Sequence, residues 1–197
     1  MAVELTAEYA GKFSAETIER CVFESYTTLS RTAKIRTHLA SLAGRFADDR
    51  LRALALSQGT ITTDVPQVLF VCVHNVGRSQ IASALLAHRA GAGVEVRSAG
   101  SLPGSEVHPL VVEVLGERGV DVSGAFPKPL TDDVVRAADY VITMGCGDAC
   151  PIYPGKHYLD WELADPSTED LRGVRAITDE IDERVERLWS EISGGPG

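Results

Sequence analysis

Residues 68–79 read VLFVCVHNVGRS, and this stretch decides the fold. The apolar run before Cys72 is typical of a buried strand, and residues Arg78–Ala90 are typical of a helix. Cys72 and Arg78 therefore bound a Cys-x5-Arg loop that joins a strand to a helix, and Ser79 follows the arginine directly. The sequence predicts that this loop wraps its backbone N–H groups around a tetrahedral oxyanion.

The residue types of this loop suit such an anion. The helix that follows presents unpaired N–H groups and the positive end of its dipole. Arg78 adds a planar fork of donors for two anion oxygens. Because both features favour negative charge, we expect Cys72 to act as a thiolate nucleophile with the Ser79 hydroxyl bonded to it. The expected anion-binding residues are His74, Asn75, Val76, Gly77 and Arg78.

Composition narrows the class of protein. The 197 residues carry a net charge of −9 and are 44% hydrophobic, which is ordinary for a globular protein and gives no basic patch for nucleic acid. No apolar run approaches a membrane span, and the first residues lack a secretory signal pattern. The four cysteines favour cytoplasmic redox chemistry over a secreted disulfide scaffold. We expect no membrane partner, no cofactor and no metal.

Two regions follow from the apolar spacing. Residues 1–62 have helical periodicity with Ser14 as an N-cap, Cys21 on the apolar face, and Gly44 and Gly59 between segments, which predicts a small three-helix bundle. Residues 66–197 form the second predicted domain. Its expected strands are 68–72, 94–97, 140–144 and 156–159, and its expected helices are 78–90, 109–118, 131–137 and 170–192.

Strands that alternate with helices predict an α/β fold, here a parallel four-stranded sheet flanked by helices. Ligands of such folds lie beyond the carboxyl ends of the strands. Cys72 ends one predicted strand and Cys146 follows another, so both cysteines are expected at one site.

At this point the chain resembles the low-molecular-weight protein tyrosine phosphatase family, and within it the arsenate reductase branch. Besides residues 68–80, the resemblance rests on Ser98-Ala99-Gly100, Thr143-Met144 and Asp165-Pro166, which follow in the family's order. The resemblance covers about residues 66–193 and implies that Asp165 is the general acid for the leaving oxygen. Helix capping is the alternative role for Asp165, and Asp160 and Glu162 are alternative acids.

The resemblance also implies a thiol relay that reduces arsenate to arsenite. Cys72 would attack arsenic, Cys146 would attack Cys72, and Cys150 would pass the disulfide to thioredoxin. Phosphate or sulfate would compete with arsenate. The Cys-x3-Cys spacing of Cys146 and Cys150 is shorter than in well-known members. A related branch instead uses mycothiol and mycoredoxin, which leaves both cysteines as bystanders.

Other interpretations stay open. The family's potassium-binding carboxylate would fall at Ser83, so no potassium site is expected. Cys146 and Cys150 are structural thiols in one alternative, and in another they bind a metal together with His157. A phosphatase that uses Cys72, Arg78 and Asp165 is the second functional candidate. A regulatory oxyanion-binding module is the third, and residues 1–62 carry no chemical motif.

Overall fold

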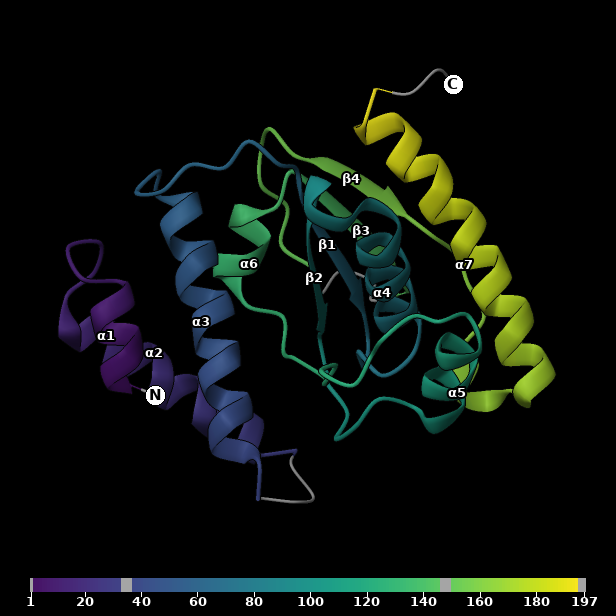
Figure 1. The fold of residues 1–197 in the computed structure, drawn as a ribbon, viewed down its shortest axis with the longest axis horizontal. Helices are drawn as coiled ribbons and strands as arrows, with labels where there is room; N and C mark the ends of the chain where they lie inside the picture. Colours follow the sequence, from purple (N-terminus) through teal and green to yellow (C-terminus); the bar gives the residue numbers. More distant parts are fainter. Residues whose placement is uncertain (1, 33–36, 146–149, 195–197) are drawn as a thin grey trace. The chain divides into compact units, whose positions relative to one another are not determined.

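The computed structural model describes residues 2–32, 37–145 and 150–194 (Figure 1). The chain divides into two compact units. The first comprises Met1–Asp64 together with Thr131–Ala137, and the second comprises Val65–Leu130 and Ala138–Gly197. Within the described residues, no helix is both long and apolar enough to cross a membrane.

A parallel sheet forms the centre of the second unit. Its strands are β1 (Gln67–Cys72), β2 (Glu95–Gly100), β3 (Tyr140–Met144) and β4 (His157–Asp160). They lie in the order β2-β1-β3-β4, and all three pairings are parallel. Cys72 pairs with Gly100 on one side and with Met144 on the other, so three strands end at the level of Cys72.

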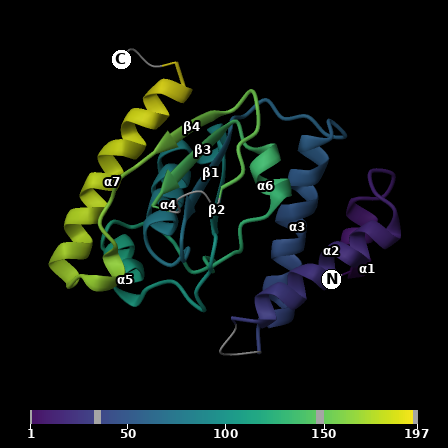
Figure 2. The same ribbon diagram turned by 180° about the vertical axis from the view of Figure 1, so that it is seen from behind.

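One face of this sheet is covered by α4 (Arg78–Ala90), α5 (Pro109–Glu117) and α7 (Leu171–Ile192), which lie on the same side in both views (Figures 1 and 2). Val68, Phe70 and Ile142 point into this core, where they meet Ile81 of α4. The buried residues of α7 have the spacing expected of an amphipathic helix, and they are Val174, Ile177, Thr178, Ile181, Val185 and Leu188. Short 3-10 turns occur at Gly91–Gly93 and Pro166–Thr168.

The first unit consists of α1 (Ala2–Glu8), α2 (Ala15–Ser30), α3 (Leu39–Ser57) and α6 (Asp132–Ala137). Ser14 caps α2 by accepting a hydrogen bond from the Thr17 N–H, as predicted. Burial raises the pKa of the Cys21 thiol, which lies in the core of this unit.

The predicted fold class is confirmed, and the differences are local. The predicted break at Gly44 is wrong because Gly44 lies buried inside the continuous helix α3. The helix α1 was not predicted. Strands β2 and β4 begin one residue later than predicted, and β2 extends to Gly100.

Candidate active site

Cys72 ends β1 in a buried environment, and two donors surround its sulfur. The Asn75 N–H donates to Cys72 Sγ over 3.2 Å, and Ser79 Oγ lies 2.9 Å from it. Asn75 Nδ2 in turn donates to Ser79 Oγ over 2.8 Å, so the Ser79 proton is free to point at the sulfur. Two hydrogen-bond donors toward Sγ stabilise a thiolate, the form needed for nucleophilic attack.

The carbonyl groups of the oxyanion loop, defined as residues Cys72–Ser79, are held from outside. The acceptors and their donors are Cys72 O with Ser101 N (3.2 Å), Val73 O with Leu102 N (2.8 Å), His74 O with Gly104 N (2.9 Å), Asn75 O with Gln80 Nε2 (3.0 Å), Val76 O with His108 N (2.9 Å) and Gly77 O with Ile81 N (2.9 Å). In a trans peptide unit, the N–H points opposite to the C=O. The N–H groups of residues 73–78 therefore point away from these outer donors.

This arrangement produces the concavity that the sequence predicts. One hydrogen bond shows this inward direction directly. The Asn75 N–H belongs to the same peptide unit as His74 O, and it points at Cys72 Sγ. The first N–H groups of α4 have no intrahelical acceptor and add to the same ring. A ring of N–H groups next to a helix N-terminus binds tetrahedral anions.

The shape of the loop depends on the backbone conformation of Asn75 and on the missing side chain of Gly100. Asn75 has φ 51°, a conformation that few side chains other than glycine tolerate. A Cβ built on Gly100 would lie 2.7 Å from Val73 O and 3.0 Å from Asn75 N. Glycine is therefore required for steric reasons at the end of the Ser98-Ala99-Gly100 sequence, because any side chain at position 100 would clash with the loop.

Arg78 and Asp165 face each other beside the loop. Arg78 Nη2 lies 3.0 Å from Asp165 Oδ2, and both side chains are partly buried. Burial raises the pKa of the Asp165 carboxyl, but the hydrogen bonds from Ser167 and the charges of Arg78 and His74 outweigh it, so the pKa lies below its ordinary 3.8.

Asp165 is also a cap, since its side chain accepts from the Ser167 N–H at the start of the 3-10 turn Pro166–Thr168. The structure therefore shows the capping role weighed from the sequence, and the general-acid role stays a prediction. Asp160 instead accepts a hydrogen bond from the Thr143 hydroxyl. The Glu162 backbone carbonyl accepts from Arg184. Neither contacts Arg78 in the described hydrogen bonds.

Two glycines allow close approach around the arginine. A Cβ on Gly77 would lie 2.5 Å from Pro166 Cγ, so its missing side chain makes room for the Asp165-Pro166 turn. Gly145 has φ +73°, and a Cβ there would lie 3.0 Å from Arg78 Nη1. The chain that leaves β3 therefore passes directly against Arg78.

The candidate relay cysteines follow Gly145. Cys146 lies outside the described residues. Cys150 is 9% exposed, with Pro151 O 3.9 Å from its sulfur. The Tyr158 hydroxyl of β4 accepts from Tyr153 N over 2.9 Å and donates to Pro151 O over 3.1 Å, which fastens the segment after Cys150.

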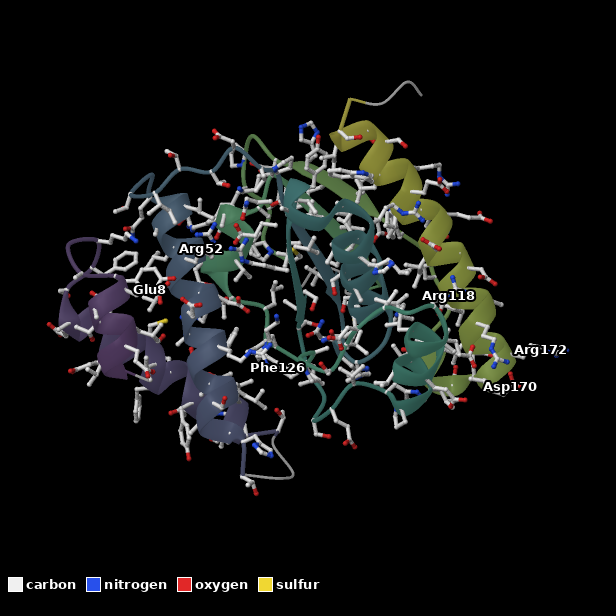
Figure 3. The ribbon with its side chains drawn as sticks, viewed as in Figure 1. Glu8, Arg52, Arg118, Phe126, Asp170 and Arg172 are labelled. Carbon is white, nitrogen blue, oxygen red and sulfur yellow. The ribbon has the colours of Figure 1, made fainter. Side chains whose placement is uncertain are left out.

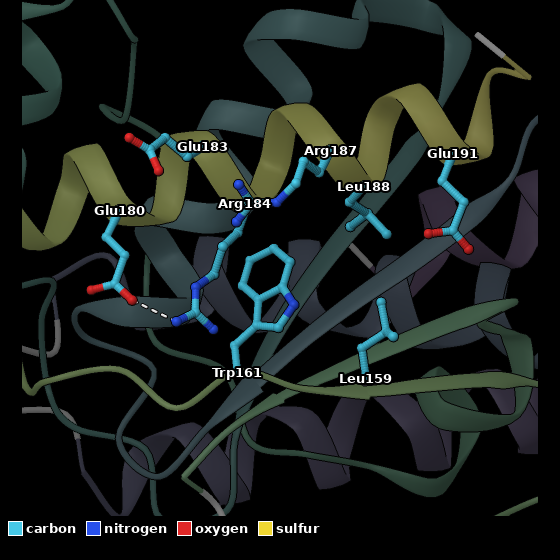
Figure 4. Close-up of a pocket in the computed structure, with 8 residues that line it drawn as sticks. All are labelled: Leu159, Trp161, Glu180, Glu183, Arg184, Arg187, Leu188 and Glu191. Atoms are coloured by element: carbon cyan, nitrogen blue, oxygen red, sulfur yellow. Dashed lines mark hydrogen bonds and ion pairs between the residues drawn. The ribbon is translucent and has the colours of Figure 1, made fainter. Parts of the chain in front are cut away.

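A metal site and a pocket are the other candidate binding features. Among the described residues, no group of three His, Cys, Asp or Glu side chains can hold a metal ion. A cavity of about 480 Å³ lies between Trp161 after β4 and α7 (Figure 4). Its lining comprises Leu159, Trp161, Glu180, Glu183, Arg184, Arg187, Leu188 and Glu191, and the excess of carboxylates makes it a poor oxyanion site.

Sequence reasoning missed Gln80 as a residue of this site. Its side chain reaches back to Asn75 and across to Phe126 O, 46 positions away. No local motif indicates such a contact, because a glutamine in the first turn of a helix is ordinary.

A buried cysteine, an arginine and a ring of N–H groups define an oxyanion-binding nucleophile site on a parallel α/β fold. Residues 67–194 match the family of low molecular weight phosphotyrosine protein phosphatases, and the chain belongs to this family. Residues 1–55 match the N-terminal domain of protein-tyrosine-phosphatase-like proteins.

The most similar relatives include arsenate reductases. The solved thioredoxin-dependent arsenate reductase of Corynebacterium glutamicum is 66% identical, with a TM-score of 0.91 over 98% of this chain and 94% of that chain. A putative arsenate reductase of Halobacterium salinarum is 36% identical over 129 residues, which are 63% of this chain and 91% of the relative. The YwlE arginine phosphatase of Geobacillus stearothermophilus is 28% identical, with a TM-score of 0.58 over 66% of this chain and 94% of that chain.

Proposed function

We propose that this protein reduces arsenate to arsenite, with Cys72 as the nucleophile and Cys146 and Cys150 as a relay to thioredoxin. The observation that carries the proposal is the oxyanion loop, in which two donors face Cys72 Sγ and the loop carbonyls are held outward. The resemblance over almost the full chain to a thioredoxin-dependent arsenate reductase supports the choice of arsenate and thioredoxin.

In the first step, the Cys72 thiolate attacks arsenic and an As–O bond breaks. Arg78 and the N–H groups of the oxyanion loop neutralise the oxyanion. Asp165 donates a proton to the leaving oxygen, which departs as water. Because the pKa of Asp165 lies below its ordinary value, the carboxyl must gain this proton as the anion binds beside it and pairs with Arg78. Nearby negative charge favours the protonated carboxyl.

In the second step, the Cys146 thiolate attacks Cys72 Sγ and forms a disulfide. The electron pair of the S–As bond stays on arsenic, which is reduced and leaves as arsenite. Cys150 then attacks Cys146, which releases the Cys72 thiolate and leaves a Cys146–Cys150 disulfide. A thioredoxin dithiol reduces that disulfide, so two electrons pass from thioredoxin to arsenic. The close approach of Gly145 to Arg78 supports a relay cysteine at the next position.

The test is NADPH-coupled arsenate reduction by the purified chain with either thioredoxin and its reductase or mycothiol and mycoredoxin. The variants are Cys72→Ser, Cys146→Ser and Cys150→Ser, and Cys21→Ser is the matched control because this thiol lies buried in the other unit. We expect turnover with thioredoxin that is lost in the first three variants and kept in the control.

Other outcomes would replace the proposal. Turnover with mycothiol alone, lost in Cys72→Ser but kept in Cys146→Ser and Cys150→Ser, would make the protein a thiol transferase. No turnover with either donor, together with rapid hydrolysis of an aryl phosphate, would leave a phosphatase that uses the same loop.

A further inference from the structure

Gln80 contacts the oxyanion loop from the first turn of α4. The side chain is 4% exposed, and its Nε2 lies 3.0 Å from Asn75 O, 3.1 Å from Asn75 Oδ1 and 3.1 Å from Phe126 O. All three neighbours are acceptors, so the amide nitrogen must face them. The reversed amide would place an oxygen against three oxygens.

The first consequence concerns one peptide unit of the loop. Of the six carbonyls from Cys72 to Gly77, five accept a backbone N–H, whereas Asn75 O accepts the Gln80 side chain. Because a trans peptide directs its C=O and N–H oppositely, this bond also sets the direction of the Val76 N–H. A substitution at Gln80 can therefore release this peptide unit while the other five keep their backbone donors.

The second consequence concerns the thiolate. Asn75 Oδ1 accepts from Gln80 Nε2 and from the Lys128 N–H over 2.8 Å. With its oxygen occupied on that side, the Asn75 amide turns Nδ2 toward Ser79 Oγ. The Ser79 hydroxyl then keeps its proton for Cys72 Sγ. The direction of every hydrogen bond in this chain follows from the amide orientation at Gln80 and the fixed Lys128 N–H.

We propose that Gln80 is a positioning residue, which presets the Asn75–Val76 peptide unit and the Asn75 side chain so that the loop binds an oxyanion next to a stabilised thiolate. Gln80 does not touch the anion, and it acts through Asn75. The proposal deepens the proposed function and rests on its oxyanion site, but it holds equally for reduction of arsenate and for hydrolysis of a phosphate ester.

The test measures the binding of inorganic phosphate by calorimetry to the full chain and to three variants. Gln80→Glu keeps the shape but sets a carboxylate against three acceptors, and Gln80→Met removes the donor. Ser83→Ala is the matched control, since Ser83 lies one turn further along α4 and its hydroxyl bonds only the Gln80 backbone carbonyl, over 3.1 Å, among the described hydrogen bonds. We expect both Gln80 variants to bind phosphate roughly tenfold more weakly, equal to about 1.4 kcal/mol, and the control to bind like the wild type.

A pH series separates positioning from a general packing role. As the pH falls, the introduced carboxylic acid gains an O–H that can donate to Asn75 O, so the affinity of Gln80→Glu relative to wild type should recover. Gln80→Met should show no such recovery. Asp121 and Lys128 line the same cavity as Gln80, and the Lys128 ammonium lies 5.2 Å from the Phe126 ring centre. The wild type measured at each pH corrects for their titration and for that of phosphate.

The outcomes distinguish the two proposals. Gln80 variants that unfold like the wild type and bind phosphate equally well would overturn the positioning role and leave the function intact. A loss in Gln80→Glu that does not change with pH would also overturn it. A wild-type protein that binds no phosphate and no arsenate would remove the oxyanion site, and both proposals would fall together. If Gln80→Met does not fold, the isosteric Gln80→Glu series decides.

Discussion

At the scale of single residues, Gly145 is expected to leave the space that the Arg78 guanidinium needs. Gly145→Ala places a Cβ 3.0 Å from Arg78 Nη1, at a φ of +73°. Gly155 has a similar φ of +79° with nothing within 4 Å, so Gly155→Ala carries the backbone strain alone. Both variants should lose about 1–2 kcal/mol of stability in chemical denaturation. Only Gly145→Ala should also bind phosphate more weakly, by roughly tenfold. Equal phosphate affinity in the two variants would contradict this role.

Asp165 gives a prediction for stability as a function of pH. Its folded-state pKa lies below the ordinary 3.8, so the ionised carboxyl stabilises the folded protein fully above that pH. This contribution disappears as the pH falls through the lower folded-state value. Asp165→Asn should therefore be less stable than wild type at neutral pH, by no more than about 1 kcal/mol for a partly exposed ion pair. Urea denaturation across an acidic pH series should show the two proteins converge, and a gap that widens in acid would refute the assignment.

At the scale of elements, α7 depends on its N-cap. The Asp170 side chain accepts from the Gly173 N–H over 2.8 Å at the start of the helix, where Figure 3 labels it. Asp170→Ala should cost about 1 kcal/mol because it leaves that N–H without its partner. Asp170→Asn should be nearly neutral, since asparagine caps as well as aspartate. Thermal unfolding of the two variants distinguishes the cap from the charge, because a pure charge effect would make them equally unstable.

The Tyr158 hydroxyl of β4 holds the segment that follows Cys150. Tyr158→Phe removes the bonds to Pro151 O and Tyr153 N but keeps the ring. We expect the alkylation rate of Cys150, read by mass spectrometry of its peptide, to rise by roughly three- to tenfold, because about 1 kcal/mol of hydrogen bonding is lost. Cys21, buried in the other unit, is the internal control. An unchanged rate at Cys150 would show that other contacts keep this thiol covered.

These elements also show what the sequence can predict. The helix Arg78–Ala90 and the strand Tyr140–Met144 have the predicted bounds because local apolar spacing and end signals determine them. The nucleophile, the arginine and the acid were predicted, and the structure brings them together around one loop. Four of the six donors to the loop carbonyls were not predictable, since they come from residues 101–108 through the tertiary fold. The predicted helix boundary at Gly44 was wrong because tertiary packing also acts there. Burial inside α3 outweighs the low helix propensity of glycine.

At the scale of the whole molecule, α6 ties the family domain to the N-terminal helices. Residues 132–137 lie inside the segment that matches the phosphatase family, yet they form one compact unit with α1, α2 and α3. Arg50 of α3 donates to Asp133 over 2.9 Å, and the two side chains are 15% and 11% exposed. Val134 and Val135 of α6 are buried as well.

A deletion of residues 1–64 should therefore not yield a monomeric family domain. It removes Arg50, leaves the Asp133 carboxylate without this partner, and uncovers Val134 and Val135. We expect concentration-dependent association in size-exclusion chromatography. The same deletion with Val134→Ser and Val135→Thr should be more monomeric, because the exposed apolar face is then polar.

In the full chain, Arg50→Ala should lower the free energy of unfolding by about 1–3 kcal/mol, between the values for exposed and buried ion pairs. A deletion variant that stays monomeric and reduces arsenate like the full chain would show that the N-terminal helices are dispensable to the family domain, and that α6 needs no cover from them.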